Sequence, residues 1–145
     1  AGFSVKMPDT WTPIFDLSNK AKVQQINDNA ENYINAVLTG IKERTVDNHM
    51  QGVVPYAVRI FMDPMYNNER KTQHFSVSDK CIGCSLCARK CPVQAIQMKD
   101  KRPVWIKDQC AACLRCLHHC PTFAIQYGKG ATNRHGQYKN PHVKV

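Results

Sequence analysis

The chain has 145 residues, enough for one ordinary domain or two small ones, and its formal net charge is +9. The charge is uneven: residues 70–145 carry 14 Lys and Arg against 3 acidic residues, whereas residues 1–69 carry 6 against 8. No basic segment followed by a long apolar run is visible in the sequence. We therefore expect neither a signal peptide nor a membrane-spanning helix, and we place the protein in the reducing cytoplasm.

Residues 1–45 are predicted to form a short strand and an amphipathic helix. The strand is expected in GFSVKM (2–7) and a proline-punctuated loop follows it, with Ser18 as the N-cap of a helix from Asn19 to Arg44. Apolar residues recur through this helix at helical spacing: Val23, Ile26, Ala30, Tyr33, Ile34, Val37, Leu38 and Ile41. A single helix and one short strand cannot bury this apolar stripe by themselves. We expect it to pack against the cysteine-rich segment, a second copy of the chain, or further sequence.

Residues 46–74 are predicted to form an irregular connector, and residues 128–145 a basic tail. Gly52, Pro55 and Pro64 interrupt the connector, VVPYAVRIF (53–61) contains a candidate short strand, and YNNERK (66–71) has the composition of a solvated turn. The tail, GKGATNRHGQYKNPHVKV, contains no acidic residue. Disorder or loose wrapping is the default expectation for such a terminus.

Residues 75–127 contain an internal repeat with a constant offset of 29 residues. The offset relates nine pairs of identical residues, among them all eight cysteines, Asp79 and Asp108, Pro92 and Pro121, and Ala95 and Ala124. So many matches in one register indicate a duplication. The duplication predicts a pseudo-twofold module with two short strand pairs and two cysteine-bearing loops, each running into a helical turn.

The two cysteine runs have the spacing that binds iron–sulfur clusters. Each run reads C-x2-C-x2-C-x3-C-P, in which three cysteines wrap one cluster and the fourth binds the other cluster. The first predicted cluster is held by Cys81, Cys84, Cys87 and Cys120, and the second by Cys110, Cys113, Cys116 and Cys91. The sequence therefore predicts two 4Fe-4S clusters whose ligands interleave, so that neither half folds without both clusters.

Other interpretations of these residues were weighed. Zinc sites favour paired C-x2-C knuckles separated by a longer span, and clustered cysteines in a reducing compartment are seldom disulfides. His118 and His119 lie inside the second run and are interpreted as surface or packing residues, with a proton-linked potential as the alternative. Trp105 and Tyr127 are interpreted as core residues rather than electron relays. No catalytic residues are predicted, because every cysteine is assigned to iron.

From about Phe75 to Tyr127 the sequence resembles a bacterial-type two-cluster ferredoxin, since all eight ligands and both prolines match. The resemblance implies a ferredoxin-like α+β fold and one-electron transfer. More widely, SVKMPDTWTPIFD, the following helix and RHGQYKNP resemble the C-terminal part of flavodoxin–ferredoxin fusion proteins. That resemblance implies that residues 1–45 are the last strand and helix of a flavodoxin-like domain. The phosphate-binding loop of a flavodoxin is absent, so FMN is expected only if a further N-terminal domain exists.

Three functions follow as hypotheses. The first is a low-potential electron carrier with no chemistry of its own, docking on a redox partner protein through the basic cluster segment; such a partner would be acidic. The second is the cluster module of a larger flavin-containing oxidoreductase, with a flavodoxin-like domain as partner. The third is a nucleic-acid-binding protein, against which the sequence shows no interleaving of basic and aromatic residues. We expect no nucleic-acid and no membrane partner.

Overall fold

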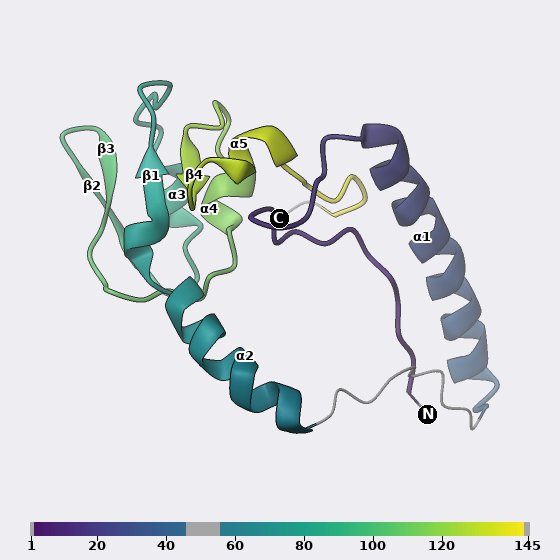
Figure 1. Ribbon diagram of the computed structural model, residues 1–145. Coiled ribbons are helices and arrows are strands. Elements are labelled where there is room, and N and C mark those ends of the chain that lie inside the picture. The colour runs from purple at the N-terminus through teal and green to yellow at the C-terminus, as the bar shows by residue number, and fades with distance from the viewer. Residues whose placement is uncertain (1, 46–55, 144–145) are drawn as a thin grey trace.

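The computed structural model describes residues 2–45 and 56–143. Its elements in chain order are α1 (Lys20–Lys42), α2 (Tyr56–Glu69), the 3-10 turn η1 (Thr72–His74), β1 (Phe75–Val77), α3 (Leu86–Arg89), β2 (Ile96–Lys99), β3 (Arg102–Trp105), α4 (Arg115–His118), β4 (Ile125–Tyr127) and α5 (Ala131–His135). Figure 1 shows the strands grouped with α3, α4 and α5 at one side, and α1 at the other. This mixture of helices and small sheets is compatible with the expected α+β ferredoxin-like module. Within the described ranges, no helix has both the length and the apolar content needed to cross a bilayer.

The two short strand pairs predicted from the repeat are present. β1 pairs antiparallel with β4, with Phe75 opposite Tyr127, and so joins the two ends of the cysteine-rich segment. β2 pairs antiparallel with β3, which follows it directly. Asp100 and Lys101 connect this hairpin with positive φ values of 50° and 60°, the combination that a two-residue type I′ turn requires.

The core of the cysteine-rich segment lies between the strand pairs and α4. Its buried members are Ile96, Leu114, Cys116, Leu117, Ile125 and Tyr127. Phe75 stacks on Trp105 at a centroid distance of 4.8 Å and meets Tyr127 edge-on at 4.9 Å. The Tyr127 hydroxyl donates to the carbonyl of Glu69 at 2.6 Å, which ties the end of α2 to this core. Trp105 and Tyr127 are therefore core residues, as expected.

The strand predicted at residues 2–7 is wrong, because residues 3–10 have no regular secondary structure. A strand needs a partner for its backbone groups. The loop that follows residues 2–7 is held by side chains of α4 and of the tail rather than by a strand. The carbonyl of Thr10 accepts from His118 Nε2 at 2.8 Å, and the carbonyl of Thr12 accepts from His135 Nδ1 at 2.7 Å. Of the expected strand and helix, only the helix is present.

The helix α1 differs slightly in its bounds from the prediction. Asn19, not Ser18, is the N-cap, and its side chain accepts the Lys22 N–H at 3.0 Å. The apolar stripe is fully buried only in the first half of the helix, and Tyr33, Ile34 and Val37 beyond it are half-buried. Val23 and Ala30 are buried, whereas Leu38 is 49% exposed and Ile41 is 57% exposed.

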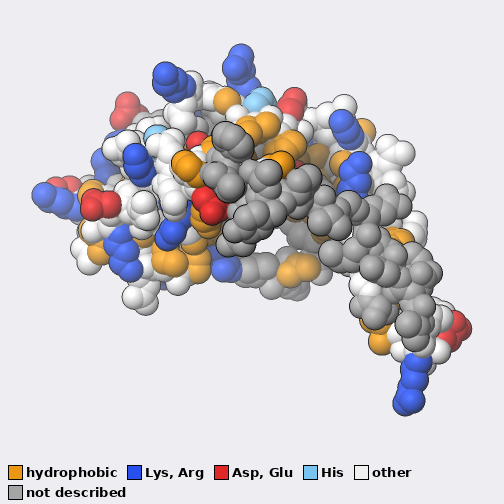
Figure 2. Space-filling view, turned by 60° about the horizontal axis from the view of Figure 1, so that its bottom comes forward, with side chains coloured by type: hydrophobic (Ala, Val, Ile, Leu, Met, Phe, Trp, Pro, Cys, Tyr) orange, Lys and Arg blue, Asp and Glu red, His pale blue; other side chains and the backbone are white. Residues whose placement is uncertain are grey.

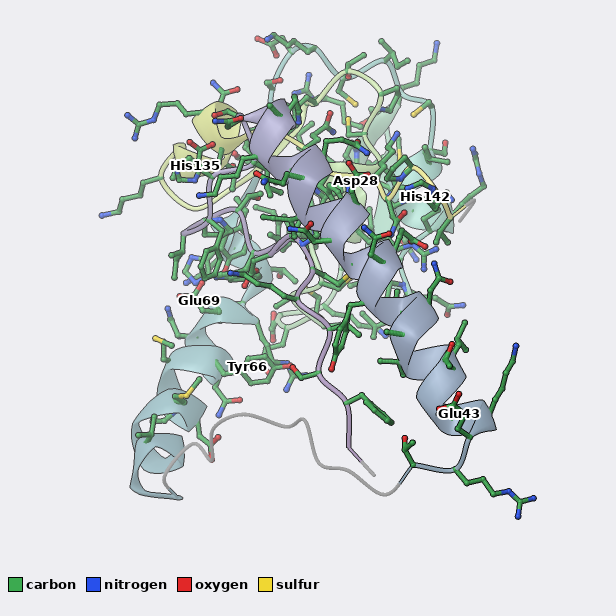
Figure 3. All side chains as sticks on the ribbon, turned by 90° about the vertical axis from the view of Figure 1, so that its right-hand side faces the viewer. Asp28, Glu43, Tyr66, Glu69, His135 and His142 are labelled. Carbon is green, nitrogen blue, oxygen red and sulfur yellow. The ribbon has the colours of Figure 1, made fainter. Side chains whose placement is uncertain are left out.

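The basic tail supplies part of that cover, so the expectation of disorder is wrong for residues 131–139. The Tyr138 hydroxyl donates to the buried Asn27 Oδ1 at 2.7 Å, and Lys20 Nζ donates to the carbonyl of Gln137 at 3.0 Å. Leu17 N–H donates to the carbonyl of His135 at 2.9 Å. In Figure 3, His135 and His142 lie on either side of the upper half of α1. Loose wrapping, the alternative expectation, describes the tail better.

The connector is helical over residues 56–69 and forms a 3-10 turn at residues 72–74. The predicted strand is therefore wrong for residues 56–61, and residues 53–55 lie outside the described ranges. Tyr66 to Glu69 form the last turn of α2 rather than a solvated turn, although Tyr66 is 54% exposed. Pro64 lies inside the helix, where it removes one backbone hydrogen bond. Apolar residues in this stretch do not alternate strictly with polar ones, which explains why a strand did not form.

A test of the cover on α1 compares two positions on its apolar stripe. Ala30→Asp introduces a charge at a site that is 3% exposed. An uncompensated buried polar group costs at least about 2 kcal/mol, so this variant should lose stability and helical circular dichroism signal. Leu38→Asp, at a half-exposed site on the same helix, is the control and should be nearly neutral. Equal losses in the two variants would contradict the described burial.

A second test concerns Gly83, which precedes the second cysteine of the first run. Gly83 has φ +69°, and a Cβ there would lie 2.9 Å from the carbonyl oxygen of Lys101 in the hairpin turn. Gly128 has φ +68° with no atom within 4 Å of such a Cβ. Both alanine variants incur the left-handed backbone cost of about 1–2 kcal/mol, but only Gly83→Ala adds a clash. Its thermal unfolding midpoint should therefore fall further than that of Gly128→Ala. Equal midpoints would show that the Lys101 carbonyl moves away from the new Cβ at no cost in stability.

Candidate iron–sulfur cluster sites

The structure brings the eight cysteines together as two sets of four, each lining its own cavity. The first cavity is lined by Cys81, Cys84, Cys87 and Cys120, together with Ile82, Ser85, Leu86, Met98, Pro103, Pro121, Thr122 and Ile125. The second is lined by Cys91, Cys110, Cys113 and Cys116, together with Phe75, Pro92, Val93, Ile96, Trp105, Ala111, Leu114 and Arg115. Each cavity takes three cysteines from one run and the fourth from the other. These are the two sets expected from the spacing, and their role as ligands stays a prediction.

The two runs share an unusual local backbone at the 29-residue offset. Gly83 and Ser85 have φ values of 69° and 63°, and the corresponding Ala112 and Leu114 have φ values of 49° and 51°. The next pair, Gln94 and Phe123, follows the fourth cysteine of each run with φ values of 50° and 52°. Non-glycine residues in this region cost about 1–2 kcal/mol each, and such strain collects at functional sites.

Backbone N–H groups point at sulfur in both runs. Ala95 N–H donates to Cys91 Sγ at 3.3 Å, and Ala124 N–H donates to Cys120 Sγ at 3.2 Å. Ala112 N–H donates to Cys110 Sγ, also at 3.3 Å. Hydrogen bonds to sulfur stabilise its negative charge, and in iron–sulfur sites they raise the reduction potential. Cys91 and Cys120 are the fourth cysteines of their runs, and each lines the cavity of the other run. Both accept the same kind of hydrogen bond, from the backbone N–H four residues further on.

Burial favours the neutral form of the inner thiols. Burial raises the pKa of Cys87, Cys110 and Cys116 above the ordinary thiol value, and neighbouring cysteines raise it further. At Cys120 burial also opposes ionisation, but hydrogen bonds from the Thr122 hydroxyl and from backbone N–H groups outweigh it and lower the pKa. Thiols held neutral in this way must lose protons when a metal centre binds.

The neighbours that act on these thiols cross between the runs. Besides its own burial, Cys87 is affected by Cys84 and Cys120, and Cys110 is affected by Cys113 and Cys91. In each case one neighbour comes from the same run and the other is the fourth cysteine of the opposite run. For these two thiols the electrostatic neighbours agree with the cavity linings, whereas Cys116 is also affected by Cys87, which lines the other cavity.

The donor set fits a cluster better than a single ion. All eight cysteines are free thiols. In the described ranges, no three His, Cys, Asp or Glu side chains converge closely enough to bind one metal ion. A zinc ion needs its ligands within about 2.3 Å of one point, whereas each corner of a cubane takes one cysteine, so four thiols can stand further apart. The separation of the four thiols in each cavity therefore favours a 4Fe-4S group over a single zinc ion.

Two supports of this site were missed by sequence reasoning. Arg70 holds the second run from outside: its Nε donates to the carbonyl of Cys110 at 3.0 Å, and its own carbonyl accepts the Cys110 N–H at 2.9 Å. Gln137 Nε2 donates to the carbonyls of Leu117 and Cys120 at 2.6 and 2.8 Å, which satisfies the open end of α4. The conspicuous RHGQYKNP motif was the available signal for Gln137.

His118 is a packing residue, as expected. It is 4% exposed, and its Nδ1 accepts the Tyr138 N–H at 3.2 Å while its Nε2 donates to the carbonyl of Thr10. It therefore links the tail and the N-terminal segment to α4. Burial lowers its pKa, in keeping with this neutral form. His119 is half-buried, and burial followed by the nearby cations Lys90, Lys139 and Arg115 lowers its pKa.

The comparisons with known proteins agree with the assignment of this segment to iron–sulfur chemistry. Residues 76–127, about a third of the chain, match the family model of the 4Fe-4S dicluster domain. No curated protein and no solved structure matches the chain. The matched segment begins in β1, ends at the last residue of β4, and contains all eight cysteines. The match supports a ferredoxin-type iron–sulfur protein that transfers electrons through 4Fe-4S chemistry.

Proposed function

We propose that this protein carries single electrons at low potential through two 4Fe-4S clusters. The observation that carries the proposal is the division of the eight cysteines into two cavities, each completed by a cysteine from the opposite run. When bound, each cluster supplies a reversible one-electron couple. Cys81, Cys84, Cys87 and Cys120 would hold the first cluster, and Cys110, Cys113, Cys116 and Cys91 the second.

The chain's own residues serve this role by shielding one side of each site and opening the other. Leu114 and Ile125 are at most 2% exposed and exclude water from the inner side of the cavities. Cys84 and Cys113, the second cysteine of each run, are exposed. An electron would therefore have a short path to the surface at each site, while the inner walls keep the remaining ligands dry.

The matched backbone geometry supports descent of the module from a duplicated half. The positive φ residues, the N–H···S bonds to Cys91 and Cys120 and the helical turns α3 and α4 all recur at the same 29-residue offset. A duplicated half with its fourth ligand exchanged gives two equivalent sites. Two equivalent sites are suited to relaying electrons rather than to binding a substrate.

The second candidate function is the cluster module of a larger flavin-containing oxidoreductase. Ile14, Phe15, Leu38 and Ile41 are between 44% and 66% exposed, and exposed apolar side chains of this kind can mark a contact with another domain. FMN would then belong to a flavodoxin-like domain outside residues 1–145. Copurification of a flavin with the natural gene product would favour this function, whereas iron without flavin would favour the simple carrier.

The proposal is tested first by metal and electron counting. Anaerobically purified protein should be brown and contain about eight iron and eight acid-labile sulfide per chain, as two cubanes require. Reductive titration should take up two electrons per chain. Dithionite should bleach the visible absorption and ascorbate should not, because ascorbate is too weak a reductant for a low-potential centre. Stoichiometric zinc without iron, or bleaching by ascorbate, would contradict the proposal.

Ligand substitutions test whether the fourth cysteine of each run binds the cluster of the other run. Cys91→Ala and Cys113→Ala should both destroy the second cluster and leave the same surviving electron paramagnetic resonance signal. Cys120→Ala and Cys84→Ala should both leave the other signal. Iron should fall by about half in each variant that stays folded, because four of the eight ligands serve each cluster. Loss of all iron in a single-ligand variant would instead bear out the expectation that neither half folds without both clusters. If Cys91→Ala left the same signal as Cys84→Ala, each run would hold its own cluster and the assignment would be wrong.

A further inference from the structure

A hollow of about 860 Å³ lies beside the second cysteine cavity. Its walls come from the two ends of α3 (Leu86 and the C-cap Lys90), from α4, from Thr10 and from the tail at residues 138–143. Cys113, Pro92 and Arg115 line both the hollow and the second cavity, and Leu86 lines both the hollow and the first cavity. The hollow therefore lies directly outside the exposed thiol of the second site.

The charge around this hollow has one sign. Lys90, Arg115 and Lys139 line it together with His118 and His119, and its described lining includes no Asp or Glu. The side chain Nε of Arg115 is buried and makes no hydrogen bond. On the face shown in Figure 2, Lys and Arg side chains are scattered at separate points and lie among apolar and acidic ones. The hollow differs from such a surface in gathering three cations around one concavity.

The size and position of the hollow narrow the kind of occupant. Its volume exceeds what one phosphate or one carboxylate fills, so it can admit a protruding segment of another protein. The occupant must also bring an electron acceptor or donor close to Cys113, which a simple anion cannot do. Complementary charge would raise the rate of encounter and fix the orientation of such a partner.

We propose that this hollow is the docking site for an acidic segment of the redox partner, whose Asp or Glu side chains pair with Lys90, Arg115 and Lys139, and that electrons pass through the second cluster at Cys113. The inference rests on the proposed electron-transfer function. It adds a specific exit site and a specific partner surface. The first cluster would then exchange electrons with the second rather than with the partner directly.

The experiment compares two double variants of equal net charge in the intact, cluster-loaded protein. Lys90→Glu with Lys139→Glu reverses charge in the hollow, and Lys99→Glu with Lys129→Glu reverses it at exposed positions that do not line the hollow. The probe is a purified acidic flavodoxin. Affinity is measured by calorimetry with both proteins oxidised, and the electron-transfer rate is measured by stopped flow at low salt.

The hollow variant should lower the second-order rate constant and the affinity by roughly tenfold or more, and the control variant by about twofold at most, because steering depends on where the charge lies. Iron content and both paramagnetic signals should match those of the parent protein in each variant. Lys139→Glu alone, on the exposed tail, should give an intermediate loss. It serves as the decisive variant if Lys90→Glu impairs cluster loading.

Three outcomes would overturn the proposal. Equal losses in the two double variants would show that only net charge matters. No loss in either variant would show that the hollow is not the docking site. If inorganic phosphate blocked flavodoxin binding more strongly than chloride at equal ionic strength, the hollow would be a small-anion site. The proposed function would fail separately, by absence of iron or of electron transfer in the parent protein.

Discussion

The exchange of one cysteine between two neighbouring cavities is the constraint on which the rest of the structure depends. The buried apolar cluster of the cysteine-rich segment has six members, two of them an aromatic ring and a thiol, which is a small core for the segment it must hold. Bonds from thiolate to iron can contribute the missing folding free energy. Cys91 and Cys120 each line the cavity of the opposite run, so under the proposed function neither run would be loaded while the other is detached.

The elements around the cavities are arranged to hold these crossing cysteines in place. β1 and β4 close the segment from its two ends, and the stacked rings of Phe75 and Trp105 wall the second cavity. Arg70 and Gln137 reach in from outside the repeat to bind backbone groups at Cys110 and Cys120. The strained left-handed residues before α3 and α4 are tolerated because the surrounding contacts fix them.

The sequence determined the site far better than it determined the flanking segments. The spacing alone predicted which four cysteines line each cavity. The fixed separations between the cysteines of a run determine which of them can lie close together. The repeat likewise predicted both strand pairs. Helix α1 was predicted to within two residues because its apolar period is long and regular. The strand at residues 2–7 was wrong because a strand depends on a distant partner, which no local pattern specifies.

The tail and α2 were misjudged for a related reason. A glycine-containing, basic terminus has the composition of a flexible chain, yet Gln137 and Tyr138 find partners on α4 and α1 that are more than ten residues away in sequence. Pro64 was interpreted as a helix breaker, but a single proline removes only one backbone bond and the helix continues through it. Exposure along α1 could not be predicted either, since it depends on where the tail packs.

The contacts between the tail and the N-terminal segment constrain the order in which the protein assembles. Thr10, Thr12 and Asn27 bond to residues that are 108, 123 and 111 positions away. Joining such distant positions directly in an unfolded chain carries the loop-closure entropy of more than a hundred residues, and contacts of this range form slowly. Once β1 has paired with β4, residues 75 and 127 are adjacent, which shortens each of these loops by somewhat less than half. The pairing of β1 with β4 therefore favours an order in which the cysteine-rich segment forms before the two ends of the chain meet across it.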